Sequence, residues 1–275
     1  MLKILIPKNF KTFVISIAIF LSLFLQTESV FAQVGALDIS NIDKGVIGYH
    51  IAENSSQSYM LMIKKDDKTY YYYLDNGKKD YFPLQMGNGK YKVVLLEKIS
   101  GNKYKVVQSD EVTLNIKDEK QVFLNSVQNI KWMMEDAPIK KAAELTKGVT
   151  KDSEKIKIIY NYIISNYKYD KEKAKTVSSP YIPDITDIFN KKKGICFDYS
   201  SLFAAMLRSL NIPAKLVMGT SSLTKDSYHA WNEVYISDAG KWVIIDTTVD
   251  ASFKNANKPY SMEKSPDKYF ADKVY

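Results

Sequence analysis

The sequence predicts an α+β protein: an antiparallel β-sandwich-like domain over residues 33–125, followed by an α+β domain over residues 126–275. Three observations predict this division. Short β-branched and aromatic runs separated by turn signals fill the first half of the chain, and apolar residues take helical spacing beyond about Ser126. Alternating, strand-like segments then return after Ser227. The 275 residues are enough for two domains with cores of their own.

Residues 1–32 are typical of a secretory signal peptide. Lysines before residue 12 form a cationic head, an apolar run follows from Thr12 to Leu25, and Val30-Phe31-Ala32 places small residues where a signal peptidase cleaves. The apolar run is shorter than the roughly 20 residues that a membrane-spanning helix needs. We therefore expect cleavage after Ala32 and a mature protein that is secreted, extracellular or associated with the cell envelope. An uncleaved membrane anchor is the less favoured alternative.

The charge of the chain limits its partners. The formal net charge is +8, mostly from scattered lysines. Such an excess suits contact with anionic cell-wall polymers, although an ordinary lysine-rich surface explains it as well. Arg208 is the only arginine, so the chain has almost no guanidinium groups, the bidentate donors that bind phosphates and guanine bases. No nucleic-acid partner is expected, nor any transmembrane segment after signal cleavage.

The first domain is predicted from short strand-like runs and the turns between them. The runs are residues 45–49, 59–63, 70–74, 91–96, 104–107 and 112–116. Asp75-Asn76-Gly77, Gly87-Asn88-Gly89 and Gly101-Asn102 supply the positive φ angles that tight hairpins require. Alternation along Tyr70–Tyr73 predicts that half of these rings enter the core and half lie on a surface, with a sugar-binding platform as the alternative.

The second domain begins with a predicted helix. Asp152-Ser153-Glu154 can cap it, and an apolar stripe follows at helical spacing. The stripe consists of Ile156, Ile159, Tyr160 and Ile163. A lysine-rich, proline-punctuated connection from Lys171 to Pro183 predicts a surface loop near a cleft, or equally a disordered excursion.

Cys196 is the only cysteine of the chain and directly follows the Gly194-Ile195 pair. Apolar residues at helical spacing follow it as far as Leu210, so the thiol is expected in the first turn of a helix. The unpaired N–H groups and the positive dipole end there favour a thiolate over a thiol. Cys196 is therefore a candidate nucleophile. The alternative is a small buried apolar residue, which is common for free cysteines.

Two alternating segments downstream predict an antiparallel strand pair. They are residues 227–236 and 241–248, joined by a turn at Asp238-Ala239-Gly240. A short turn would place Tyr235 opposite Trp242, Glu233 opposite Ile244, Trp231 opposite Asp246 and His229 opposite Thr248.

His229 and Asp246 then share one face of the pair, close enough for the acid to hold the imidazole. An imidazole with an orienting carboxylate is what a thiol nucleophile needs. Asp250 is the substitute for Asp246.

Four blocks of sequence carry a family resemblance. They are Gly194–Ser200, Asn211–Ala214, His229–Val234, and Trp242 together with Asp246–Thr248. In order and spacing they resemble the bacterial transglutaminase-like superfamily over about residues 150–250. The resemblance implies a papain-like α+β core for the catalytic domain, residues 126–275. Its implied catalytic residues are Cys196 as nucleophile, His229 as general base and acid, and Asp246 as orienting acid. Thr247 departs from the pattern, because the family usually has proline after the aspartate.

The resemblance implies a cysteine acyltransferase that forms a thioester with a glutamine or peptide acyl group. A lysine amine that resolves the thioester gives a crosslink, and water gives a deamidase, amidase or peptidase. The partners would be proteins or peptides bearing glutamine and lysine. A non-catalytic envelope-binding protein is the third reading.

An apolar tunnel walled by Tyr228, Trp231 and Trp242 would exclude water and favour the amine, although core packing explains these rings as well. The backbone N–H of Cys196 and a side chain from the Tyr167–Tyr181 segment are candidates for the oxyanion hole. Neither a metal nor a cofactor is predicted, because the sequence has no EF-hand spacing, no paired histidines on a helix and no second cysteine.

Overall fold

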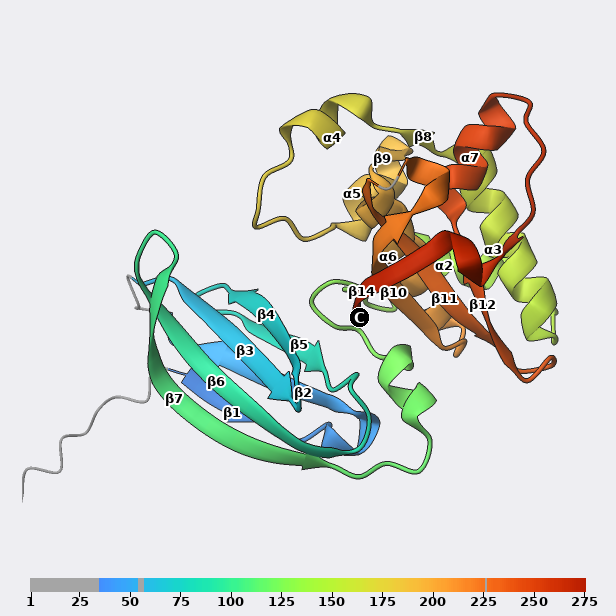
Figure 1. The fold of residues 1–275 in the computed structure, drawn as a ribbon. Coiled ribbons are helices and arrows are strands. Elements are labelled where there is room, and N and C mark those ends of the chain that lie inside the picture. Colours follow the sequence, from blue (N-terminus) through green and yellow to red (C-terminus); the bar gives the residue numbers. More distant parts are fainter. Residues whose placement is uncertain (1–34, 54–56, 226) are drawn as a thin grey trace, which may run out of the picture. The chain divides into compact units, whose positions relative to one another are not determined.

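The computed structural model describes residues 35–53, 57–225 and 227–275, shown as a ribbon in Figure 1. The expected signal peptide, residues 1–32, lies outside the described residues. Within the described ranges, no helix has the length and apolar character needed to cross a membrane.

The first half of the chain forms two antiparallel sheets. One has the order β1-β2-β5 and comprises β1 (Gly35–Asp38), β2 (Val46–Ile51) and β5 (Lys79–Pro83). The other has the order β4-β3-β6-β7 and comprises β3 (Tyr59–Lys65), β4 (Lys68–Leu74), β6 (Gly89–Ser100) and β7 (Lys103–Leu114). Short 3₁₀ helices lie at η1 (Ile42–Lys44) and η2 (Glu119–Leu124). The predicted antiparallel architecture of this region is confirmed.

Two details of this half differ from the expectation. The runs 104–107 and 112–116 belong mainly to one long strand, β7, because no glycine or proline interrupts the polar residues between them. Strand β5 was not predicted, because it begins with two polar residues and ends with a proline.

The tyrosine run on β4 alternates as predicted. Tyr70 and Tyr72 are buried, whereas Tyr71 is 53% and Tyr73 40% exposed. The Tyr72 ring lies 4.8 Å from the ring of Phe82 on β5, so the buried rings join the two sheets.

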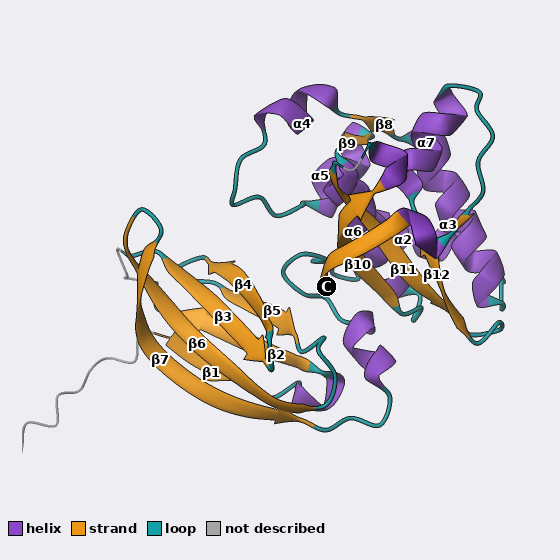
Figure 2. Ribbon diagram, viewed as in Figure 1, coloured by secondary structure: helices purple, strands orange, loops and turns teal. Residues whose placement is uncertain are grey.

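Helices and one larger sheet form the second half, and Figure 2 shows that the α-helices belong to this half. The helices are α2 (Ala137–Leu145), α3 (Asp152–Asn166), α4 (Lys171–Thr176), α5 (Ile185–Lys191), α6 (Cys196–Ser209) and α7 (Thr247–Asn255). The sheet has the order β13-β12-β11-β10-β14 and is antiparallel throughout.

Its strands are β10 (Ala214–Ser221), β11 (Tyr228–Ile236), β12 (Lys241–Ile245), β13 (Glu263–Lys264) and β14 (Tyr269–Val274). A short parallel pair, β8 (Lys168–Tyr169) with β9 (Lys193–Gly194), and two 3₁₀ turns, η3 (Ser222–Thr224) and η4 (Pro266–Lys268), complete the half. The predicted helix at residues 152–163 is confirmed as α3, and the 171–183 connection begins with α4.

Helix α6 is the central element of the second half. It packs against β10 and β11 and against four other helices. Residues 198–208 are all buried, and the side chains of Leu202, Phe203 and Leu207 are fully buried. Rotamers in such an interior are held by close packing. The first residue of α6, Cys196, therefore stands on a rigid support.

The predicted strand at residues 241–248 is wrong in its last three positions. The pairs Glu233–Ile244 and Tyr235–Trp242 are present. Beyond Ile245 the chain turns into α7, with Asp246 as its N-cap and the Asp246 side chain accepting a hydrogen bond from Val249 N. Aspartate followed by two threonines is a helix-start sequence, and this local preference ended the alternation.

Candidate active site

Cys196 begins α6 and is half-buried. The residue before it, Ile195, has extended backbone geometry and occupies the N-cap position. Asp198, two residues after the cysteine, turns back and accepts a hydrogen bond of 2.8 Å from Ile195 N. The backbone on either side of Cys196 is thus fixed, and the thiol is carried by the first residue of the helix, at the positive end of its dipole.

A cavity of about 290 Å³ opens over the thiol, and both Cys196 and His229 line it. The other lining residues are Tyr169, Leu223, Thr224, Ser227, Tyr228, Thr248, Val249, Ser252 and Phe253. None of the described lining residues carries a carboxylate, an ammonium or a guanidinium group. The cavity combines apolar side chains with hydroxyl groups and suits a neutral ligand.

His229 lies on β11 and bonds Asp246 through Nε2, at 2.8 Å from Oδ2. The carboxylate is fully buried and the ring almost so. Because Nε2 is engaged by Asp246, Nδ1 is the ring nitrogen left for the thiol. The predicted trio of Cys196, His229 and Asp246 is therefore brought together, although Asp246 reaches the ring from a helix cap and not from a paired strand.

The charge state of His229 follows from its neighbours. Burial opposes the charged ring, but the Asp246 carboxylate and the Cys196 sulfur outweigh it and raise the pKa of His229 to about 10. The imidazolium is consequently the stable form near neutral pH. A positive ring beside the cavity is a proton donor for a group bound there.

Asp250, the substitute acid, takes no part in this pair. Its carboxylate accepts a hydrogen bond of 2.8 Å from the Tyr160 hydroxyl and forms an ion pair with Lys264. Burial raises the pKa of Asp250 in spite of these partners. Asp250 thus ties α7 to β13 through Lys264 and to α3 through Tyr160.

Among the described residues, no tunnel walled by Tyr228, Trp231 and Trp242, the alternative to core packing, is formed at the cavity. Trp231 is buried behind His229, with ring centres 6.3 Å apart. Trp242 packs against Phe123 and lies under the ammonium group of Lys215 at 4.1 Å. Of the three rings considered, only that of Tyr228 lines the cavity, and it is 57% exposed. The core-packing interpretation is right for Trp231, which is buried, whereas Trp242 is half-buried and packs on Phe123 and Tyr235 away from the cavity.

Tyr169 lines the cavity from the segment expected to supply an oxyanion donor. The β8–β9 ladder places it beside Gly194, two residues before Cys196. Burial and, next, the charge of Cys196 raise the pKa of Tyr169, so its hydroxyl stays protonated and able to donate.

A buried charged cluster next to Cys196 was missed in the sequence. Asp198 is completely buried. Its Oδ2 accepts from Lys173 Nζ at 2.6 Å, and its Oδ1 accepts from the Tyr181 hydroxyl. Lys173 also bonds the Tyr181 oxygen at 2.6 Å. The cluster fastens the 171–183 connection to the start of α6. The only signals for this cluster in the sequence were the glycine at position 194 and an acidic residue, Asp198, within the first turn of the helix that Cys196 begins.

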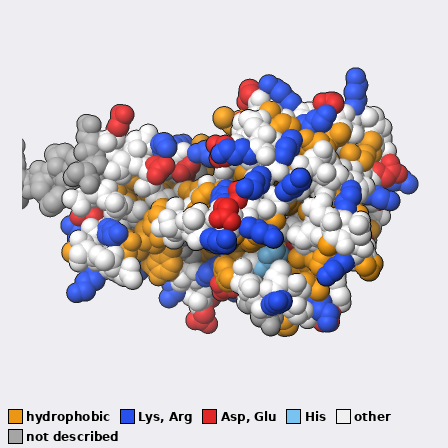
Figure 3. All heavy atoms as spheres, turned by 90° about the horizontal axis from the view of Figure 1, so that it is seen from above, with side chains coloured by type: hydrophobic (Ala, Val, Ile, Leu, Met, Phe, Trp, Pro, Cys, Tyr) orange, Lys and Arg blue, Asp and Glu red, His pale blue; other side chains and the backbone are white. Residues whose placement is uncertain are grey.

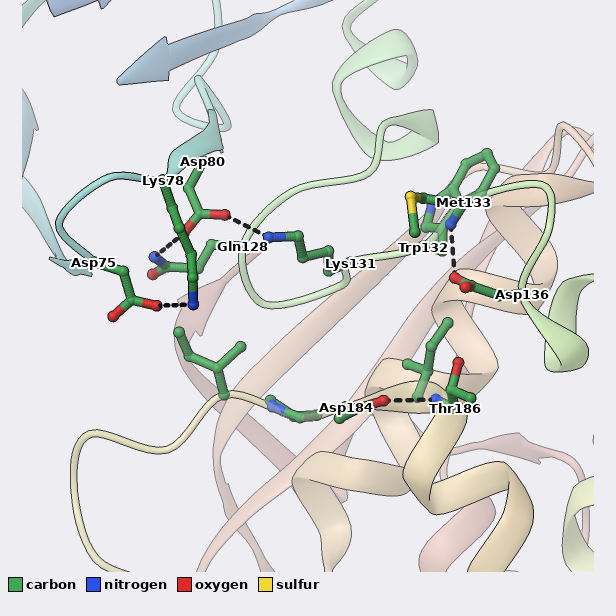
Figure 4. A pocket seen from close by; sticks show the side chains of 13 residues that line it. Asp75, Lys78, Asp80, Gln128, Lys131, Trp132, Met133, Asp136, Asp184 and Thr186 are labelled. Carbon is green, nitrogen blue, oxygen red and sulfur yellow. Dashed lines mark hydrogen bonds and ion pairs between the residues drawn. The ribbon is translucent and has the colours of Figure 1, made fainter. Parts of the chain in front are cut away.

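A larger hollow of about 390 Å³ shares no lining residue with the Cys196 cavity. Its charged walls are paired among themselves, as Figure 4 shows: Lys78 with Asp75 at 3.0 Å and Lys131 with Asp80 at 2.8 Å. Asp184 caps α5 through the N–H groups of Thr186 and Asp187. These acids are thus used in holding the surrounding loops.

Parts of the chain match known proteins. Residues 139–247 match the family model of the transglutaminase-like superfamily. The chain is 26% identical over 163 residues to the uncharacterized protein YebA of Bacillus subtilis, covering 53% of this chain and 22% of YebA. It is 32% identical over 128 residues to the UPF0252 protein MJ1282 of Methanocaldococcus jannaschii, covering 43% of this chain and 36% of that protein. The chain thus spans about a third or less of these relatives.

Among solved structures, the periplasmic domain of TgpA from Pseudomonas aeruginosa is similar with 15% identity and a TM-score of 0.39. The similarity covers 76% of this chain and 74% of that domain.

Proposed function

The chain is a transglutaminase-like superfamily protein over residues 139–247, and on this premise we propose that it is a cysteine acyltransferase acting on amides. The Cys196 thiolate attacks the carbonyl carbon of a glutamine side chain or a peptide bond. The observation that carries the proposal is the shared cavity of Cys196 and His229, with Asp246 behind the ring.

The residues of the site divide the chemistry as follows. A carbon–sulfur bond forms, and the tetrahedral oxyanion is held by the N–H of Cys196 and the hydroxyl of Tyr169. The His229 imidazolium gives its proton to the departing nitrogen, the carbon–nitrogen bond breaks, and a thioester remains. The neutral ring then takes a proton from the incoming water or amine. Collapse of the second tetrahedral intermediate releases the thiolate, and Asp246 keeps the ring oriented throughout.

We infer that water is the principal acceptor. The wall of the cavity includes the exposed ring of Tyr228 and the exposed side chain of Leu223, and neither tryptophan closes it. Water therefore reaches the thioester, and hydrolysis follows. A lysine amine is the second candidate acceptor, favoured by the apolar lining from Leu223, Val249 and Phe253, which suits its alkyl stem.

The remaining expectations complete the proposal. The leader directs the protein out of the cell, cleavage after Ala32 gives the mature chain, and the β half, residues 33–125, positions the catalytic domain, residues 126–275, on its substrate. Figure 3 shows lysine side chains scattered over the face in view, which fits a diffuse attraction to anionic cell-wall polymers. Mass spectrometry of the exported protein tests the first part: its first residue should be Gln33.

The activity is tested by incubating the purified protein with dimethylated casein as glutamine donor and a dansylated primary amine. Ammonia release without label indicates deamidation, new amino termini indicate proteolysis, and fluorescent casein indicates transamidation. Each should vanish in Cys196→Ala. An enzyme that gives none of the three products, and whose thiol reacts with iodoacetamide no faster than glutathione at pH 6, would instead be a non-catalytic binding protein.

A further inference from the structure

Tyr269 lies near the Cys196 site without lining its cavity. It is the first residue of β14 and is 7% exposed. The register pairs it with Ser221 at the end of β10. Because β10 separates β14 from β11, the strand that carries His229, the Tyr269 side chain spans a neighbouring strand to meet the residues of the site.

The hydroxyl of Tyr269 completes the hydrogen bonding of Asp246. It donates to Oδ2 at 3.0 Å, the same oxygen that His229 Nε2 contacts at 2.8 Å. The other oxygen, Oδ1, accepts from Val249 N at 3.0 Å. The carboxylate is thus held from β11, from β14 and from α7. It cannot turn away from the imidazole without breaking another of these bonds.

The ring of Tyr269 supports the imidazole as well. It packs on Trp231, with ring centres 5.0 Å apart, and Trp231 in turn stacks on His229 at an interplanar angle of 25°. Val217, Trp231 and Tyr269 form a small apolar cluster of their own, separate from the main core. One side chain therefore contacts both the acid and the residue that backs the base.

Resting on the proposed function, we propose that Tyr269 is a positioning residue of the Cys196–His229 pair. Its hydroxyl fixes the Asp246 carboxylate, and its ring, through Trp231, fixes the plane of the imidazole. The Cys196 thiolate and the His229 imidazolium are then already held in their reactive arrangement when the substrate binds. Such preorganisation of charged groups raises the rate of reaction.

Other charged groups near Asp246 stay in place when the hydroxyl is removed. His229 faces it from β11, and Asp250 follows one turn later on α7, already paired with Lys264. Burial and the Asp246 charge raise the pKa of Tyr269, so the hydroxyl remains a donor throughout the working range.

The test is the alkylation of the single thiol by iodoacetamide, measured from pH 5 to pH 9 in the whole protein. In Tyr269→Phe we expect the rate at pH 6 to fall about tenfold, because the imidazolium that holds the thiolate is no longer fixed. At pH 9, where cysteine ionises without help, the change should be less than about twofold.

Tyr91→Phe is the matched control. Tyr91 is equally a buried tyrosine, and its hydroxyl donates to the carbonyl oxygens of Leu84 and Gly87 in the N-terminal half. Its alkylation profile should coincide with that of the wild type even though stability falls. Both variants are measured at 15 °C in 1 M sucrose, which favours the folded state.

The outcomes separate the two proposals. A Tyr269→Phe profile equal to the wild-type profile, or lowered by the same factor at pH 6 and pH 9, overturns the positioning role and leaves the proposed function standing. A wild-type thiol no faster than glutathione at pH 6, unchanged by His229→Gln, overturns the proposed function itself.

Discussion

Gly194 and Asp198 lie so close together that any side chain at position 194 would displace the acid. A Cβ added to Gly194 would lie 2.7 Å from the Asp198 Cβ and 2.9 Å from its Oδ2. The glycine therefore makes room for the buried acid that closes the first turn of α6. The constraint is steric, since the backbone of Gly194 needs no left-handed φ.

The first prediction concerns this contact. Gly194→Ala should lower the free energy of unfolding by about 2 kcal/mol, the usual cost of overpacking, and should slow alkylation of Cys196. Urea unfolding and iodoacetamide kinetics measure the two effects. Gly101→Ala is the comparison: its Cβ meets nothing within 4 Å, so only its left-handed backbone costs stability and the thiol should react normally. Normal thiol kinetics in Gly194→Ala would contradict the role given to Asp198.

The second prediction concerns the ion pair between Lys173 and the buried Asp198. Lys173→Met removes the charge partner of a buried carboxylate and should cost about 2 kcal/mol, less than a fully buried pair because the Lys173 side chain is 26% exposed. Lys175→Met is the matched control on the same helix, since Lys175 pairs only with the exposed Glu172 and its loss should cost less than about 0.5 kcal/mol. Equal losses in urea unfolding for the two variants would show that the Asp198 cluster contributes nothing.

The third prediction is a pH dependence of stability. The folded protein raises the pKa of His229 from 6.5 to about 10. A raised folded pKa contributes stability that is complete below pH 6.5 and is lost as the pH rises through 10. The difference in unfolding free energy between wild type and His229→Gln should therefore shrink by a few kcal/mol from pH 6.5 to pH 10.5. The lysines and tyrosines titrate in both proteins, so their contributions cancel in this difference. A difference that does not change with pH would show that His229 is not charged in the folded protein.

The fourth prediction separates the two acids of α7. Asp246→Asn should lower alkylation and acyl transfer by on the order of 100-fold or more, because the ring loses its orientation and its charge partner. Asp250→Asn should change them by less than about threefold, because Asp250 contacts Tyr160 and Lys264 and not the ring. Release of p-nitrophenol from p-nitrophenyl acetate provides the assay. The reverse order of effects would reassign the acid.

The fifth prediction assigns Tyr169. If its hydroxyl holds the oxyanion, Tyr169→Phe should reduce kcat on the same ester by about 10- to 100-fold with little change in KM. Tyr71→Phe, an exposed tyrosine of β4, is expected to match the wild type. A rise in KM at constant kcat would make Tyr169 a binding residue only.

Local patterns predicted the parts of this protein that depend on local physics. The helix start at Cys196, the turn at Asp238 and the pairs Glu233–Ile244 and Tyr235–Trp242 follow from spacing within a few residues. The contact of His229 with Asp246 was also expected, but through the wrong element. An aspartate on a strand paired with β11 and an aspartate that caps a helix just after that strand lie in nearly the same place. The alternation of apolar and polar residues alone could not distinguish these two arrangements.

Contacts between distant segments were not predictable in this way. Tyr269 meets Asp246 across 23 residues and a change of strand order, and Lys173 meets Asp198 from a connection that the sequence allowed to be disordered. Neither residue carries a periodic signal of its own. Their partners are decided by how the sheet and α6 assemble, which a single sequence does not show.

Asp246 carries two duties at once, holding the imidazole with one oxygen and starting α7 with the other. Thr248, Val249 and Ser252, on the helix that it starts, form part of the cavity wall. A relative that lost the thiol would still use this aspartate to begin α7. The aspartate should therefore be retained in relatives that have lost the cysteine. An aspartate at this position in a relative is evidence of the same helix cap and not, by itself, of the same activity.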